Sequence, residues 1–312
     1  MALLPEPADV PGLFRATLGE PDMVLPGLVK GTVGGLISPG GVGKSFWALG
    51  AALSVASPAG GALMGFDVMP GRVVFLSAED DEYAFGRRLQ AYGAVHPKLA
   101  KRALGLTYYN CLGRNLDVCD DATLDALCEA GQGARLVVLD TLSRFHSLDE
   151  NVARDMKLLI SRLEQVAQLT GAALMYLHHT SKASVTGGQG AAQQAARGSS
   201  VLVDNARWAA FLEPMSEAQA RAHDLSAADR ELYVRWNVSK QNYGPAMSDY
   251  WYRRDTGGAL VPVRLCARRE LQREPDASSA EVGDIEVMTR GARPKPKAVS
   301  LPSVKGVNNG DW

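Results

Sequence analysis

The sequence predicts an α/β fold: a mainly parallel β-sheet flanked by helices, followed by a β-rich C-terminal extension. Strand-like and helix-like segments alternate from residue 32 onward, which is typical of sheets whose strands run parallel. Several of the strand segments are apolar without interruption, as expected of strands buried on both faces. In residues 231–239, apolar and polar side chains alternate, which indicates a strand of a different kind in the extension.

The expected elements follow one another in a regular order. Strands are expected at residues 32–37, 72–77, 106–110, 136–140 and 172–179, with helices at 46–53, 83–94, 122–130 and 151–169. The last helix is the most clearly amphipathic, because Met156, Leu159, Leu163 and Val166 share one face. Strands of the extension are expected at residues 207–212, 231–239 and 249–254, with a turn at 242–245.

Three regions are expected along the chain. Residues 1–30 form an arm interrupted by prolines, which is either a surface tail or a segment that packs on a neighbouring subunit. Residues 31–265 form the main domain, with a Gly-, Gln- and Ser-rich loop at 180–197. Residues 266–312 lack periodicity and carry basic residues between prolines, so we expect a disordered basic tail.

Composition limits the classes of partner. A chain of 312 residues with 46% hydrophobic residues can bury a large core. The formal net charge of −1 gives no global electrostatic basis for binding nucleic acid, so any DNA contact must be local. The four cysteines have no metal-ligand spacing, and no signal peptide or membrane span is expected. These features predict a cytoplasmic protein with reduced thiols and no membrane partner.

The segment 38–45 reads Ser-Pro-Gly-Gly-Val-Gly-Lys-Ser and joins a strand to a helix. Strand, glycine-rich turn and helix are the setting of a phosphate-binding loop, because backbone N–H groups and the helix start attract an anion. Ser38 stands where the pattern G-x-x-x-x-G-K-[ST] has its first glycine. We expect Lys44 to reach the β- and γ-phosphates of ATP and Ser45 to bind Mg²⁺. The expected nucleotide-binding residues are Ser38, Gly40, Gly41, Val42, Gly43, Lys44, Ser45 and Phe46.

Two carboxylates follow other strands of the same sheet. Asp140 ends the most apolar strand, where a second group that supports Mg²⁺ is expected. Glu79 lies just past the strand at 72–77, and the carboxyl ends of parallel strands meet at one edge. We therefore expect Glu79 to act as the base that activates or orients the attacking water. The plain alternative is that residues 79–81 only begin the next helix.

His178 and His179 end another strand, immediately before the Gly-rich loop. Successive side chains of a strand point to opposite faces, so at most one of the two histidines can face the phosphate. We favour His179 as the residue that senses the γ-phosphate.

Six segments of the chain, taken in order, resemble those of a known family. The segments 38–45, 77–80, 138–146, 177–182, 197–208 and 238–244, in this order, resemble the RepA-type hexameric replicative helicases of plasmids. The resemblance covers about residues 22–263 and leaves the basic tail outside. It implies a RecA-like P-loop core assembled as a homohexameric ring, with ATP between adjacent subunits and single-stranded DNA in the channel.

The resemblance also implies roles for single residues. It makes Arg207 the arginine finger that completes the neighbouring subunit's nucleotide site, with Lys240 as a second cation at that interface. Arg88 corresponds to a nucleotide contact. Lys182 and Arg197, in the Gly-rich loop, correspond to contacts with DNA phosphates. A primase and an origin-binding initiator are the further partners that the resemblance implies.

The predicted function is thus an ATP- and Mg²⁺-dependent replicative DNA helicase. A RecA-like ATPase of recombination or repair, which would form filaments, stays open as an alternative. So do a small-molecule P-loop kinase, which would need no arginine from a neighbour, and a regulatory ATP-binding module with little turnover.

Overall fold

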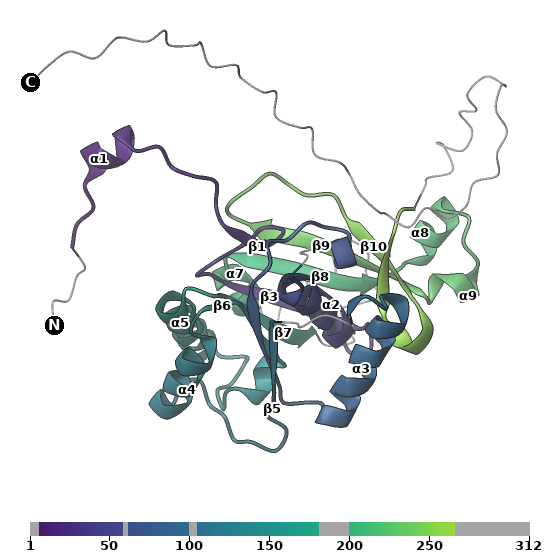
Figure 1. The fold of residues 1–312 in the computed structure, drawn as a ribbon, viewed down its shortest axis with the longest axis horizontal. Coiled ribbons are helices and arrows are strands. Elements are labelled where there is room, and N and C mark those ends of the chain that lie inside the picture. The colour runs from purple at the N-terminus through teal and green to yellow at the C-terminus, as the bar shows by residue number, and fades with distance from the viewer. Residues whose placement is uncertain (1–5, 59–61, 100–104, 181–199, 266–312) are drawn as a thin grey trace, which may run out of the picture.

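A sheet with strand order β11-β10-β9-β8-β3-β7-β6-β4-β5 runs through the part of the protein that the structure describes (Figure 1). The structure is a computed structural model that describes residues 6–58, 62–99, 105–180 and 200–265. The strands from β8 to β5 in this order are parallel, and β9, β10 and β11 extend the sheet in antiparallel fashion. The parallel strands are β3 (Val33–Pro39), β4 (Arg72–Ser77), β5 (Leu106–Asn110), β6 (Ala134–Asp140), β7 (Ala173–Thr180) and β8 (Trp208–Pro214). The antiparallel strands are β9 (Tyr233–Gln241), β10 (Tyr250–Arg254) and β11 (Leu260–Val263).

Helices cover both faces of the sheet. One face packs against α2 (Lys44–Ala56) and α3 (Glu82–Val95), and the other packs against α4 (Asp121–Gly131), α5 (Ala153–Thr170) and α7 (Ser200–Asn205). Shorter elements are α1 (Val10–Arg15), α8 (Glu217–Ala222), α9 (Ala227–Arg230) and the 3₁₀ turns η1 (Ala62–Met64), η3 (Leu142–Arg144) and η6 (Thr256–Gly258). None of the helices in the described ranges has the length and apolar character that crossing a membrane would require.

The two-sided core follows from the uninterrupted apolar strands. On β4, Val73 and Phe75 enter the core beneath α2 and α3, whereas Val74 and Leu76 enter the core beneath α4 and α5. This alternation is the period of an extended strand, and it confirms the prediction of strands buried on both faces. The predicted apolar stripe of α5 is also confirmed, since Met156, Leu159, Leu163 and Val166 are buried.

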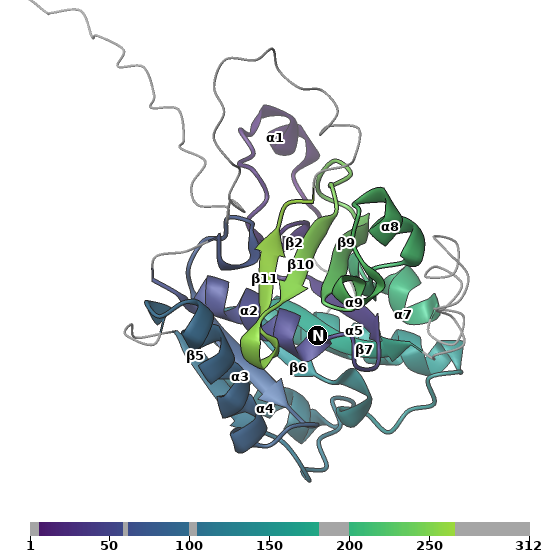
Figure 2. The same cartoon turned by 90° about the vertical axis from the view of Figure 1, so that its right-hand side faces the viewer.

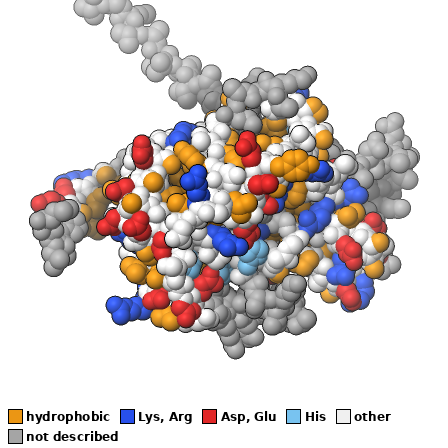
Figure 3. Space-filling view, turned by 90° about the horizontal axis from the view of Figure 1, so that it is seen from below, with side chains coloured by type: hydrophobic (Ala, Val, Ile, Leu, Met, Phe, Trp, Pro, Cys, Tyr) orange, Lys and Arg blue, Asp and Glu red, His pale blue; other side chains and the backbone are white. Residues whose placement is uncertain are grey.

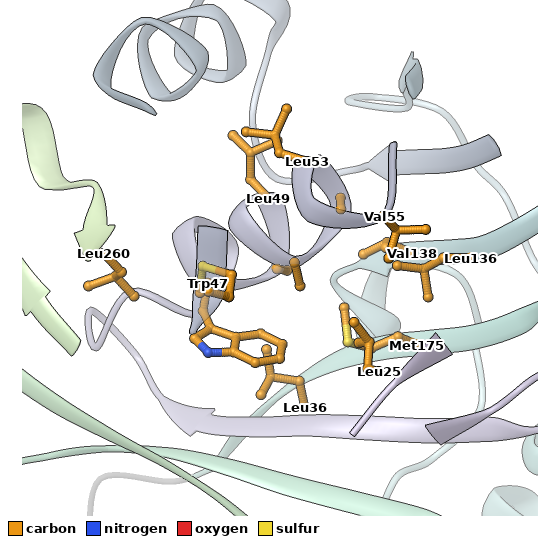
Figure 4. Packing of buried hydrophobic residues seen from close by; sticks show 14 of the residues in the cluster. Leu25, Leu36, Trp47, Leu49, Leu53, Val55, Leu136, Val138, Met175 and Leu260 are labelled. Atoms are coloured by element: carbon orange, nitrogen blue, oxygen red, sulfur yellow. The ribbon is translucent and has the colours of Figure 1, made fainter. Parts of the chain in front are cut away.

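An aromatic cluster joins the antiparallel extension to the parallel core. Trp47 of α2 stacks on Trp236 of β9 with ring centroids 4.8 Å apart, and Phe66 lies 5.6 Å from Trp236. Figure 4 shows Trp47 pointing from α2 towards Leu36 on β3, with Leu260 of β11 beside the same helix. The extension is therefore part of one continuous core and not a separate lobe.

The beginning of the core differs from the prediction. Residues 23–29, assigned to the N-terminal arm, form a hairpin of β1 (Met23–Leu25) and β2 (Leu28–Val29) whose Val24 and Leu28 are fully buried. The part that projects is shorter and contains α1, where Phe14 is 89% exposed. The sequence patterns also missed the helices α8 and α9 and the strand β11, each of which is too short to show a clear period. The predicted basic tail lies outside the described residues.

We expect Trp236→Ala to lower the free energy of unfolding by about 3–5 kcal/mol, because it removes a fully buried ring that contacts both α2 and β10. Urea unfolding followed by circular dichroism measures the change. Tyr83→Ala is the control, because Tyr83 is 71% exposed and should change stability by less than about 0.5 kcal/mol. Equal losses in the two variants would contradict the assignment of Trp236 to the core.

Candidate nucleotide site

The segment 38–45 forms the predicted loop between a strand and a helix. β3 ends at Pro39 and α2 begins at Lys44. Gly41 and Gly43 have φ values of +81° and +103°, which only glycine adopts readily, so the glycines at these two positions have a conformational reason. No side chain caps the start of α2. The amide groups of this first turn are therefore free to bind an anion, and the helix dipole adds to the attraction.

The pairing of β3 with β7 brings the loop beside the second histidine of the pair. Ser38 lies opposite His179 in the register of the two strands. The Lys44 Nζ atom lies 3.1 Å from Nδ1 and 3.2 Å from Nε2 of His179. The same Nε2 atom lies 3.5 Å from a carboxylate oxygen of Glu79. Lys44, His179 and Glu79 therefore form a continuous chain of polar contacts at the carboxyl edge of the sheet.

Burial and opposite charges determine the electrostatics of this chain. Burial lowers the pKa of Lys44, of which 4% is exposed, while Asp140 and Glu79 oppose that change. The hydrogen bond from His179 is the main reason that the pKa of Glu79 lies below its usual range, with Lys44 and Arg144 adding to the effect. Glu79 is therefore a carboxylate at neutral pH, as a residue that orients or activates water requires.

Asp140 ends β6 and is fully buried. Burial raises the pKa of its carboxyl group to about 6, against the lowering influence of the Ser45 hydroxyl and Lys44. The Ser45 hydroxyl faces the carboxylate, yet neither carboxylate oxygen accepts a hydrogen bond of full geometry within the described residues. A buried carboxylate without partners is costly, and a cation would stabilise it.

Ser45 and Asp140 thus fit the Mg²⁺ ion that accompanies a nucleoside triphosphate. No group of three or more His, Cys, Asp or Glu that could hold a metal occurs in the described ranges. An Mg²⁺ ion held by one hydroxyl, one carboxylate, phosphate oxygens and water needs no such group. When bound, the ion would neutralise charge on the phosphates, while Ser45 and Asp140 hold its position.

The two adjacent histidines face opposite ways, as predicted. His179 is exposed on the nucleotide side, whereas His178 is 4% exposed and lies near Glu150 and His146, which influence its pKa. Burial lowers the pKa of His178 to about 4, so this imidazole is neutral at physiological pH. In the space-filling view from below, histidine and basic side chains meet near the centre of the surface, with acidic side chains around them (Figure 3).

The three acidic residues 79–81 that follow β4 have different partners. Glu79 belongs to the polar chain described above, whereas Asp81 caps α3 by accepting a hydrogen bond of 2.8 Å from the Ala84 amide. Asp80 forms an ion pair of 2.6 Å with Arg88. The Arg88 guanidinium also lies 5.5 Å from the centre of the Phe46 ring. Arg88 and Phe46 are therefore neighbours beside the start of α2.

Arg207 and Lys240 lie at the other edge of the sheet. Trp208, the first residue of β8, pairs with Gly34 near the amino end of β3. Arg207 is exposed and has no hydrogen bond or ion pair within the described part of the chain. Lys240 donates hydrogen bonds to the carbonyl groups of Val203 and Asp204 at the end of α7. The structure therefore does not bring Arg207 and Lys240 to Lys44 of the same chain.

The predicted DNA contacts, Lys182 and Arg197, lie outside the described residues. Sequence reasoning missed two arginines near the loop. Arg144 of η3 lies close enough to Glu79 to influence its pKa, and its place after the β6 strand end was the signal available. Arg254 contacts the backbone of the loop from β10, and no sequence spacing connects segments so far apart.

Comparison with known proteins places the chain in a family. A family model described as an AAA domain matches residues 4–185, which is more than half of the chain. The chain belongs to this AAA-domain family. With the mainly parallel sheet and the loop geometry described above, it is a P-loop ATPase that binds and hydrolyses ATP.

Among solved structures, the crystal structure of the RadB recombinase is similar to this chain. The similarity has a TM-score of 0.47 and 12% sequence identity, and it covers 74% of this chain and 90% of that chain.

We expect Asp140→Asn to abolish ATP hydrolysis yet to raise the free energy of unfolding at pH 8 in the absence of Mg²⁺. The native state binds the Asp140 proton more tightly than the unfolded state does, so ionisation costs stability as the pH rises from about 4 to beyond 6. The gain should be on the order of 1–3 kcal/mol at pH 8 and should shrink towards pH 4.

Urea unfolding in EDTA at both pH values tests this, with Asp125→Asn on the exposed face of α4 as the control. A gain that is absent at pH 8, or equal at the two pH values, would contradict the account of Asp140.

Proposed function

We propose that this ATPase works as a hexameric ring that translocates on single-stranded DNA and unwinds duplex DNA during plasmid-type replication. The resemblance to RepA-type helicases across six ordered motifs supports the proposal. It adds a primase and an origin-binding initiator as expected partners.

The position of Arg207 carries the proposal. It precedes Trp208, which pairs with Gly34, while the phosphate-binding loop begins at Pro39 on the same strand β3. Five residues of extended strand separate the two ends by roughly 16 Å. This is more than an arginine side chain can span, so Arg207 cannot complete the site of its own chain. An exposed arginine without a partner in the described residues suits the nucleotide of a neighbouring subunit.

A ring requires a heterologous interface, in which one surface of a subunit meets a different surface of the next. The two edges of the sheet provide these surfaces. The carboxyl edge holds Lys44, Glu79 and Asp140, and the amino edge of β8 holds Arg207. Repetition around the ring would place one Arg207 at every nucleotide.

Under this proposal, each composite site divides the work of hydrolysis. The loop amides and Lys44 hold the phosphates, Ser45 and Asp140 hold the position of Mg²⁺, and Glu79 activates water. Arg207 of the next subunit stabilises the charge that develops in the transition state. His179 contacts both Lys44 and Glu79, so it is well placed to respond to the γ-phosphate and to pass the change to the DNA-contacting loop that follows β7.

The net charge of −1 agrees with a ring better than with a single basic surface. A ring repeats a few loop cations around one strand, so each subunit needs few of them. Lys182 and Arg197 are the proposed phosphate contacts.

We expect wild-type protein to displace a strand from a forked duplex with ATP and Mg²⁺, and Lys44→Ala to have no activity. Arg207→Ala should lower kcat for ATP by about 10³-fold or more and leave nucleotide affinity nearly unchanged, because an arginine finger acts in the transition state. Arg154→Ala is the matched control, because Arg154 is an exposed arginine on α5. Normal hydrolysis by assembled Arg207→Ala protein would exclude the arginine-finger role.

Electron microscopy with an ATP analogue and single-stranded DNA separates this proposal from its alternative. Closed six-membered rings are expected. Open filaments, together with an absence of strand displacement, would instead favour a recombination or repair ATPase.

A further inference from the structure

The turn between β10 and β11 closes over the start of α2. A methyl group added at Gly258 would lie 2.9 Å from the Phe46 ring, and one added at Gly257 would lie 2.9 Å from Ala91 of α3. Figure 2 shows the β10–β11 hairpin lying across the side of the molecule that contains α2 and α3. The C-terminal extension therefore reaches the nucleotide site of its own chain.

Arg254, the last residue of β10, extends from this hairpin to the phosphate-binding loop. Its Nη2 atom donates a hydrogen bond to the Val42 carbonyl and lies 3.4 Å from the Gly41 carbonyl oxygen. Its Nη1 atom lies 3.0 Å from the position that a Cβ atom of residue 43 would occupy. Gly43 thus leaves the space that the guanidinium group needs in order to approach the backbone.

The contacts of Arg254 are unusual for a half-buried cation. Burial lowers the pKa of Arg254, and no acidic side chain pairs with it within the described residues. Among those residues, the polar contacts of its side chain are with loop carbonyls alone. Ion pairing therefore does not explain why an arginine occupies this position, whereas holding the loop backbone does.

The geometry of the peptide unit shows what these contacts do. In a planar trans peptide, the carbonyl group of one residue and the N–H group of the next point in opposite directions. A donor that holds the carbonyls of Gly41 and Val42 from outside therefore turns the N–H groups of Val42 and Gly43 to the other side. Those N–H groups belong to the amides that a phosphate-binding loop presents to its anion.

We propose that Arg254 is a positioning residue that orients the Val42 and Gly43 amides towards the β- and γ-phosphates. The side chain acts through the loop backbone and does not itself touch the reacting atoms. The proposal rests on ATP binding by this loop and is independent of the helicase function. It also gives the β-rich extension a role in nucleotide affinity, in addition to its place in the core.

Arg254→Lys and Arg254→Gln in the full chain test the proposal, with Arg253→Gln as the matched control. Arg253 is exposed on the opposite face of the same strand. Lysine retains the charge but lacks the planar, forked donor, so both Arg254 variants should weaken ATP and ADP binding by about tenfold. AMP, which lacks the phosphates that the loop holds, should bind with unchanged affinity, and so should every nucleotide in Arg253→Gln.

Two further measurements distinguish positioning from support of the fold. The melting temperature without nucleotide should stay within about 2 °C of the wild type, since the substitution removes no ion pair with a described residue and leaves no cavity in the apolar core. In NMR spectra, the Val42 and Gly43 amide resonances should shift in Arg254→Lys but not in Arg253→Gln. Wild-type affinity in Arg254→Lys, equal loss of AMP binding, or unshifted amide resonances would each overturn the proposal.

The titrations contain no DNA, so their outcome does not depend on unwinding. If wild-type protein fails to displace a strand but both Arg254 variants bind ATP and ADP more weakly, the helicase proposal is excluded and this one stands. If wild-type protein displaces a strand but both Arg254 variants bind ATP with wild-type affinity, this proposal is excluded and the helicase proposal stands.

Discussion

The pairing of β3 with β7 on one side and β8 on the other determines where the charged groups of the site lie. The β7 register places Ser38 opposite His179, so that His179 meets Lys44 at the carboxyl edge. β6 and β4 continue the sheet in the same direction and bring Asp140 and Ser77, two residues before Glu79, to that edge. The β8 register leaves Arg207 at the amino edge. One set of backbone hydrogen bonds thus brings His179 and Asp140 to the end of the sheet where Lys44 lies, and it keeps Arg207 at the opposite end.

The charged groups at the carboxyl edge of the sheet fit a phosphate anion and a metal cation. Lys44 and Asp140 are both buried, and the shifts in their pKa values show that burial disfavours the charged form of each. Their mutual attraction offsets part of this cost. A bound triphosphate would place negative charge beside Lys44, and its Mg²⁺ would place positive charge beside Asp140. Each buried group would then have a partner of opposite charge, which offsets the desolvation cost that both impose on the protein without substrate.

Residues at strand ends could be predicted from the sequence because a parallel sheet aligns its carboxyl ends. Lys44, Glu79, Asp140 and His179 each lie at or after the end of an apolar run, and the alternation of side chains along a strand predicts that His178 and His179 face opposite ways. Each of these positions follows from the apolar segment next to it in the sequence, so no distant contact is needed to predict it.

Features that depend on distant contacts could not be predicted in the same way. The β1–β2 hairpin contains too few apolar residues to show a period, and it is stabilised by burial against the rest of the core. Arg254 reaches a loop more than two hundred residues earlier in the chain, and only the fold of the antiparallel extension brings the two together. In the sequence, Arg254 and Arg253 are simply adjacent arginines at the end of a strand.

The central claim is that the site is completed by a second subunit, and mixing of two inactive variants tests it most directly. Lys44→Ala protein retains Arg207, and Arg207→Ala protein retains the loop, so some interfaces in a mixed assembly contain both groups. Random mixing in equal amounts predicts that ATP hydrolysis returns to about a quarter of the wild-type rate, because half of the loops and half of the arginines are intact. A mixture that stays as inactive as its components, although the subunits co-assemble, would contradict a site shared between subunits.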